Sequence, residues 1–207
     1  KFGPDGNFKN RAADSINIDI GGGTTDVIYL NKKANNYIST SFRFAANDIW
    51  GSGIIEGLKD NGFIKNFLDF NDKNKRQRDL ADSVLDSFLA NAAYKSEDVV
   101  SLLFKYDNIL KFSESIKRNN PELLFIFYLH YSAIIYHVIQ LLESKNIDML
   151  PKYFTFTGKG SQYIRLMCGD DKLTEFTILL LKSFTQLKID NGFKVILSDK
   201  PKEVTAN

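Results

Sequence analysis

Apolar and polar residues alternate in the first regular segment of the chain, residues 16–30. Isoleucines occupy positions 16, 18 and 20, and a second β-rich apolar run begins at Val27, after three consecutive glycines. A period of two is typical of strands that bury one face, and a glycine-rich break between two such runs is typical of a hairpin. The pattern therefore predicts two antiparallel strands joined by a tight glycine turn.

The same reasoning predicts three more strands. Residues 37–44 alternate and predict a third antiparallel strand, which completes a meander. A buried strand is predicted at residues 153–156 and a short alternating strand at 193–197. Residues 60–147 are expected to be almost entirely helical, and residues 173–187 form an amphipathic helix. The predicted domains are a sheet core and an inserted, mainly helical subdomain, at residues 1–58 with 148–207 and at 59–147.

Residues 123–142 contain no charged side chain and are numerous enough to span a membrane as a helix. Helical spacing places His130, His137 and Gln140 on one stripe, with large apolar residues on the others. No basic flank supports insertion into a bilayer. We therefore favour a core helix buried against a sheet. The two histidines are expected to be structural, because no third metal ligand is evident.

Composition adds little to this picture of a globular α/β protein. Of the 207 residues, 43% are hydrophobic and 25% are charged, and the formal net charge is +2. This balance predicts binding to neither nucleic acid nor a membrane surface. The lone cysteine, Cys168, has no partner for an internal disulfide, so a reducing, cytoplasmic location is expected.

The glycine turn carries the candidate chemistry. Three glycines in a row present backbone N–H groups without Cβ atoms, so a polyphosphate can approach closely and accept several hydrogen bonds. Two threonine hydroxyls follow, and the aspartate before the turn is able to hold a hydrated Mg²⁺ or orient a water molecule. The alternative is a hairpin turn without a ligand. The candidate residues are Asp19, Gly21, Gly22, Gly23, Thr24 and Thr25.

A second glycine loop follows the strand predicted at residues 153–156. Gly158, Gly160 and Ser161 lie between that strand and a predicted helix at 162–167. Backbone amides at a helix N-terminus often meet an anionic ligand, although this pattern alone is a weak signal.

These two motifs resemble those of the actin-like ATPase superfamily, which includes actin, bacterial filament ATPases and heat-shock chaperone ATPases. Residues 19–26 are similar to its second phosphate motif, which implies that the amides of residues 21–23 and the Thr24 hydroxyl face the β- and γ-phosphates of ATP. The resemblance also implies that Asp19 contacts Mg²⁺ through water or positions the hydrolytic water. Gly158, Gly160 and Ser161 resemble the adenosine motif and would pack against adenine and ribose.

The resemblance is incomplete at two loops and covers only a C-terminal half. Ala45 and Ala46 stand where glycines are common, and Lys159 replaces the usual middle glycine of the adenosine motif. The superfamily's first phosphate motif is not found in these residues. The implied fold is therefore a ribonuclease H-like, actin-type ATPase half, inactive without the N-terminal half of its own full-length chain. Self-association into filaments is a further expectation.

Other assignments remain open. Residues 19–26 would be a first phosphate motif in sugar kinases or acyl-dehydratase activators, but no second Asp-x-Gly turn follows before the loop at 158–161. Three functions are therefore considered: one half of an ATPase, an interaction scaffold that kept the fold and lost the chemistry, and a small-molecule kinase. A basic cluster is interpreted either as a solvated turn or, from the resemblance, as flanking the nucleotide; it comprises Lys73, Lys75, Arg76 and Arg78.

Overall fold

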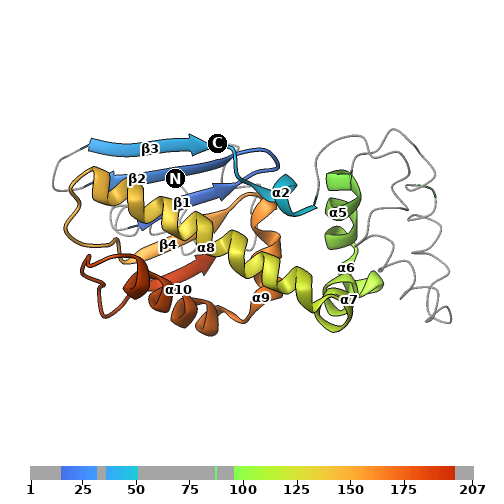
Figure 1. Ribbon diagram of the computed structural model, residues 1–207. Helices are drawn as coiled ribbons and strands as arrows, with labels where there is room; N and C mark the ends of the chain where they lie inside the picture. Colours follow the sequence, from blue (N-terminus) through green and yellow to red (C-terminus); the bar gives the residue numbers. More distant parts are fainter. Residues whose placement is uncertain (1–14, 32–35, 51–86, 88–95, 199–207) are drawn as a thin grey trace. The chain divides into compact units, whose positions relative to one another are not determined.

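The computed structural model describes residues 15–31, 36–50, 87 and 96–198 (Figure 1). The basic cluster and most of the predicted helical segment before residue 96 lie outside this part of the chain.

A five-stranded mixed sheet forms the centre of the described fold, in the order β3-β2-β1-β4-β5. Strands β1, β2 and β3 pair antiparallel as a meander, while β4 is parallel to β1 and β5 is parallel to β4. The fold class predicted from the sequence, a mixed sheet with an antiparallel meander flanked by helices, is confirmed. The strands are β1 (Ser15–Ile20), β2 (Thr25–Asn31), β3 (Asn36–Phe42), β4 (Tyr153–Thr157) and β5 (Lys194–Leu197).

The two faces of the sheet differ in polarity, as the alternation in β1 predicts. The three isoleucines of β1 are fully buried, and Ile18 stands between Val27 of β2 and Phe156 of β4. The intervening residues face the opposite side, where Asp19 stands between Asp26 and Thr157. The apolar face therefore holds the core, and the polar face carries the candidate carboxylate.

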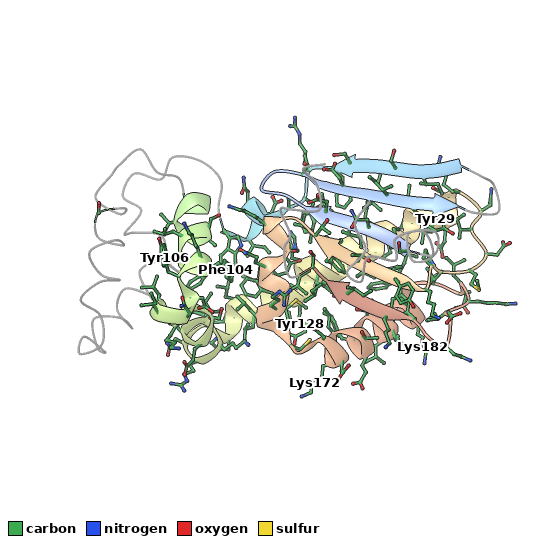
Figure 2. All side chains as sticks on the ribbon, turned by 180° about the vertical axis from the view of Figure 1, so that it is seen from behind. Tyr29, Phe104, Tyr106, Tyr128, Lys172 and Lys182 are labelled. Atoms are coloured by element: carbon green, nitrogen blue, oxygen red, sulfur yellow. The ribbon has the colours of Figure 1, made fainter. Side chains whose placement is uncertain are left out.

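Helices α8 (Pro121–Ser144) and α10 (Asp170–Phe184) lie side by side against the sheet (Figure 1). The Tyr131 ring of α8 lies 5.3 Å from that of Phe156 in β4, and its hydroxyl is 2.6 Å from Thr177 Oγ1 of α10. The ring of Tyr128, labelled in Figure 2, packs edge-on against Phe176 at 5.1 Å. These contacts are those of a core helix.

Within the described part of the chain, α8 is the one helix long and apolar enough to cross a bilayer. One of its faces is taken up by the protein core, where Phe127, Ile134 and Val138 are fully buried. The buried face favours the core-helix interpretation, and the absence of membrane binding stays a prediction.

The chain divides into two compact units, Lys1–Ala46 with Phe127–Asn207, and Asn47–Ile126. The first unit contains the sheet and the candidate residues of both glycine loops. In the second unit, the rings of Trp50 and Phe112 lie 5.8 Å and 5.2 Å from that of Phe104. This unit is shorter than the predicted insertion at 59–147, because most of α8 packs with the sheet. Its described helices are α5 (Ser96–Lys105), α6 (Asp107–Leu110) and α7 (Phe112–Asn119).

Candidate functional site

The turn between β1 and β2 is the predicted glycine hairpin. The Gly21 N–H donates to the Thr24 carbonyl oxygen at 2.8 Å, which closes a four-residue turn, and Gly22, Gly23 and Thr24 are exposed. None of these glycines has a positive φ. A Cβ atom added to Gly23 would meet no atom of the described residues within 4 Å, apart from its two neighbours in the chain. The fold therefore does not require glycine at position 23. Close approach of a ligand to the backbone would require it.

Asp19 lies just before this turn, on the polar face of the sheet. Its side chain is partly buried between Asp26 and Thr157. Burial raises the pKa of Asp19 above its ordinary value, and the neighbouring Asp26 carboxylate raises this pKa further. The negative charge of Asp19 is thus poorly compensated by the chain, which favours a nearby cation.

The second glycine loop touches the first. A Cβ atom at Gly158, where φ is +81°, would overlap Asp19 Oδ1 and the Ile20 carbonyl oxygen. A Cβ atom at Gly160 would overlap the Gly21 carbonyl oxygen. The structure therefore brings together two motifs that lie more than 130 residues apart in the sequence.

The three residues predicted to contact adenosine form the interior of this second loop. Gly158, Gly160 and Ser161 are all buried, and the Ser161 hydroxyl donates to the Gly158 carbonyl oxygen at 2.8 Å. Lys159 between them is exposed. The loop begins η4 (Lys159–Tyr163), which leads into α9 (Ile164–Met167). These residues pack the loop against the end of β1, and their contact with adenosine stays a prediction.

The two threonines of the first motif have different surroundings. Thr24 is exposed, but Thr25 is fully buried and its hydroxyl donates to the Phe44 carbonyl oxygen at 2.6 Å. A hydroxyl has a single proton to donate, and in Thr25 the peptide chain accepts it. This bond anchors β2 to the segment after β3, and the role of Thr25 as a phosphate donor stays a prediction.

That segment, residues 43–46, also contacts the hairpin. The Ala46 N–H donates to the Gly21 carbonyl oxygen at 3.2 Å, and both Ala45 and Ala46 are buried. These two alanines stand where the resemblance implies glycines. In the structure, this corner supports the hairpin at residues 21–24 through its backbone, and a backbone contact does not require glycine.

His130 supports the candidate site through hydrogen bonds that the sequence pattern did not reveal. Its Nδ1 lies 2.8 Å from the Tyr163 hydroxyl and its Nε2 lies 3.1 Å from the Ala45 carbonyl oxygen. Its ring stacks on that of Phe44 at 4.3 Å. The expectation of a structural histidine is confirmed, and the described residues contain no group of three metal-ligating side chains. Its partners are 33 and 85 residues away, beyond any local sequence signal.

The strand order and the antiparallel meander thus bring two glycine loops into contact at the ends of β1 and β4.

The similarity of this chain to known proteins is low. No family model matches the chain, and no curated protein matches it. Among solved structures, it is similar to the ethanolamine utilization protein EutJ from Carboxydothermus hydrogenoformans, with 14% identity over 93% of this chain and 47% of that one, at a TM-score of 0.42. The chain thus spans about half the length of EutJ.

Two further solved structures are similar to the chain, each at 14% identity. One is a PilM-PilN type IV pilus biogenesis complex, matched over 96% of this chain and 43% of that one at a TM-score of 0.35. The other is the activator of the 2-hydroxyisocaproyl-CoA dehydratase from Clostridium difficile with bound ADPNP. It is matched over 92% of this chain and 58% of that one, at a TM-score of 0.30. Such similarities leave the function to be argued from the residues themselves.

Proposed function

We propose that this chain is the ATP-binding half of an actin-like ATPase and that its hairpin at residues 21–24 receives the β- and γ-phosphates. One observation carries the proposal: the turn exposes backbone at Gly23 where the fold does not require glycine, beside a carboxylate whose pKa is raised by burial and by Asp26. Consecutive backbone N–H groups suit phosphate oxygens as hydrogen-bond acceptors. The exposed Thr24 hydroxyl supplies a further donor.

Asp19 is the residue that would hold Mg²⁺, through water. It fits the ion, because a carboxylate offers only acceptor oxygens and this one is partly exposed. When bound, Mg²⁺ would supply positive charge to the phosphates. The same carboxylate also suits the role of positioning a water molecule for attack.

Adenosine would lie along the loop at 158–161, whose path Gly158 and Gly160 set by packing on the end of β1. Hydrolysis is proposed only for the full-length protein, because phosphoryl transfer depends on groups positioned from both walls of a cleft. The N-terminal half of the same full-length chain is the proposed partner. Filament formation and a cytoplasmic location are parts of the same proposal.

Calorimetric titration of the full-length protein with Mg-ATP tests this function. Replacing Gly23 by alanine adds one methyl group where the chain leaves open space, so Gly23→Ala is expected to fold normally and to weaken affinity about tenfold by obstructing the phosphate. Gly169→Ala is the matched control, since a Cβ atom there also meets nothing within 4 Å. Equal affinities for the two variants, or no binding by the parent protein, would refute the proposal.

Turnover measurements separate the remaining functions. ATP hydrolysis that is lost in Asp19→Ala supports the ATPase. Tight binding of Mg-ATP without turnover identifies an interaction scaffold that kept the fold. ATP consumption that begins only when a sugar or acid is added identifies a small-molecule kinase.

A further inference from the structure

We propose that His130 and Tyr163 fix the direction of the Gly22 N–H group, through a relay of hydrogen bonds that crosses two peptide groups. This inference rests on the proposed function, because it assigns the Gly22 amide to the phosphate site. The relay runs between side chains and backbone that are distant in sequence and belong to the same compact unit.

The first part of the relay follows from which atoms are able to donate. A carbonyl oxygen only accepts, so the contact at 3.1 Å between His130 Nε2 and the Ala45 oxygen requires a proton on Nε2. In a neutral imidazole, Nδ1 is then an acceptor, and the Tyr163 hydroxyl donates to it at 2.8 Å. Tyr163 is fully buried, and burial raises the pKa of its hydroxyl well above the ordinary value, so the proton stays on the oxygen.

The second part follows from the planarity of the peptide bond. The Ala45 carbonyl and the Ala46 N–H belong to one peptide group, and the described residues contain no cis peptide bond. The carbonyl and the N–H of a trans peptide point in opposite directions. The oxygen that accepts from His130 is therefore opposite the N–H that donates to Gly21 at 3.2 Å.

The same geometry applies once more at the hairpin. The Gly21 carbonyl oxygen accepts from the Ala46 N–H and abuts Gly160, so its direction is set from two sides. The Gly22 N–H belongs to the same peptide group and points the opposite way. Because Gly22 is exposed, this N–H is directed away from the buried corner and toward the region proposed for phosphate.

All donors in this series point in one direction, from Tyr163 toward Gly22. Hydrogen bonds aligned in this way polarise one another, by about 10–30% per bond in condensed-phase estimates. The ring of His130 is held in place by stacking on Phe44, which limits loss of alignment. The relay uses only the backbone of Ala45 and Ala46, so it requires no glycine at either position. His130 and Tyr163 are thus positioning residues for the phosphate loop.

The test uses the full-length protein and its affinity for Mg-ATP. His130→Leu is expected to weaken binding about tenfold, since it removes a buried donor and acceptor together. Tyr163→Phe keeps the ring and removes only the hydroxyl, so a loss of about threefold is expected. His130→Gln, which is able to restore a donor to Ala45, should recover part of the affinity. Ile139→Ala is the control for structural damage, since this fully buried residue lies ~13 Å further along α8.

A second readout keeps the relay testable without nucleotide. The amide proton of Gly22 should move upfield in the ¹H–¹⁵N spectrum of Tyr163→Phe, while the Gly169 amide stays unchanged. If the parent protein binds Mg-ATP and both relay variants bind as tightly as Ile139→Ala, the relay is overturned and the proposed function stands. If the parent protein does not bind Mg-ATP, the proposed function is refuted. If the Gly22 resonance is unchanged in Tyr163→Phe, the relay is refuted as well.

Discussion

Two glycine loops follow neighbouring parallel strands in this protein, and their glycines are present for different reasons. In the loop at 158–161, Gly158 has a positive φ, and Cβ atoms at Gly158 and Gly160 would overlap the backbone at the end of β1. In the hairpin at 21–24, Gly23 is exposed and a Cβ atom there would touch nothing in the chain. The first loop needs glycine for folding, and the second leaves room beside its backbone.

This difference teaches how a glycine motif should be interpreted. Both loops match phosphate- or nucleotide-binding patterns in sequence, but only a structure shows whether the space beside a glycine is filled by the protein itself. The space beside the loop at 158–161 is filled, so its glycines allow this loop to pack closely on the end of β1. The hairpin is open at Gly23, so this glycine is the better candidate for contact with a ligand.

The largest expected effect is the loss of stability in Gly158→Ala. The methyl group would overlap the Ile20 carbonyl oxygen, and alanine would have to adopt a φ of +81°. Overpacking and backbone strain each cost about 1–3 kcal/mol, so a loss of roughly 3 kcal/mol or more in the free energy of unfolding is expected. Urea denaturation measures it. Gly23→Ala serves as the comparison and should unfold at or above the parental midpoint; similar losses in both variants would remove the distinction between the loops.

A smaller effect separates the adjacent threonines. Thr25→Val leaves the Phe44 carbonyl without its buried donor, at an expected cost of about 1–2 kcal/mol in the free energy of unfolding. Thr24→Val should leave stability within about 0.5 kcal/mol, because the side chain is exposed, and should reduce affinity for Mg-ATP. Denaturation and calorimetry on both variants check the pair. A loss of affinity in Thr25→Val at unchanged stability would place this residue in the binding site.

The threonines also show what sequence reasoning was able to predict. A period of two was enough to identify the meander and the buried face of β1, since burial of alternate residues is a local property of a strand. The same alternation, continued across the turn by the pairing of Ile20 with Thr25, decides which threonine is buried. The motif implied that the hydroxyls of Thr24 and Thr25 both donate to phosphate. A motif records residue types only, and the strand register decides which of these side chains points into the protein.

The contacts that support the candidate site lay beyond prediction for a different reason. His130 belongs to a helix whose apolar pattern predicts only a buried face. Its partners, Ala45 and Tyr163, come from other segments, and no local spacing records which residue will lie opposite a histidine in the folded chain. For the same reason, the alanines of the corner read as a departure from a motif until their backbone contacts were known.

The smallest expected effect concerns Asp19, whose carboxylate lies where the two loops meet. Burial and then Asp26 raise its pKa in the folded protein. The fold therefore favours the neutral acid, and this stabilisation is present below the unfolded-state pKa of about 4 and is lost as the pH rises through the folded-state pKa. Asp19→Asn, which stays neutral, should be slightly more stable than the parent protein near neutral pH, and the difference should vanish at about pH 3.

Chemical denaturation of the parent protein and Asp19→Asn at both pH values measures this difference. The gain should be small, because the side chain is partly exposed and solvent screens its charge. The variant should at the same time lose ATP hydrolysis in the full-length protein, as expected where a binding site keeps a charge that the fold alone disfavours. If Asp19→Asn were less stable than the parent protein near neutral pH, the Asp19 carboxylate would stabilise the packing of the two loops. Asp19 would then be needed for folding, as Gly158 and Gly160 are, and not for binding a ligand.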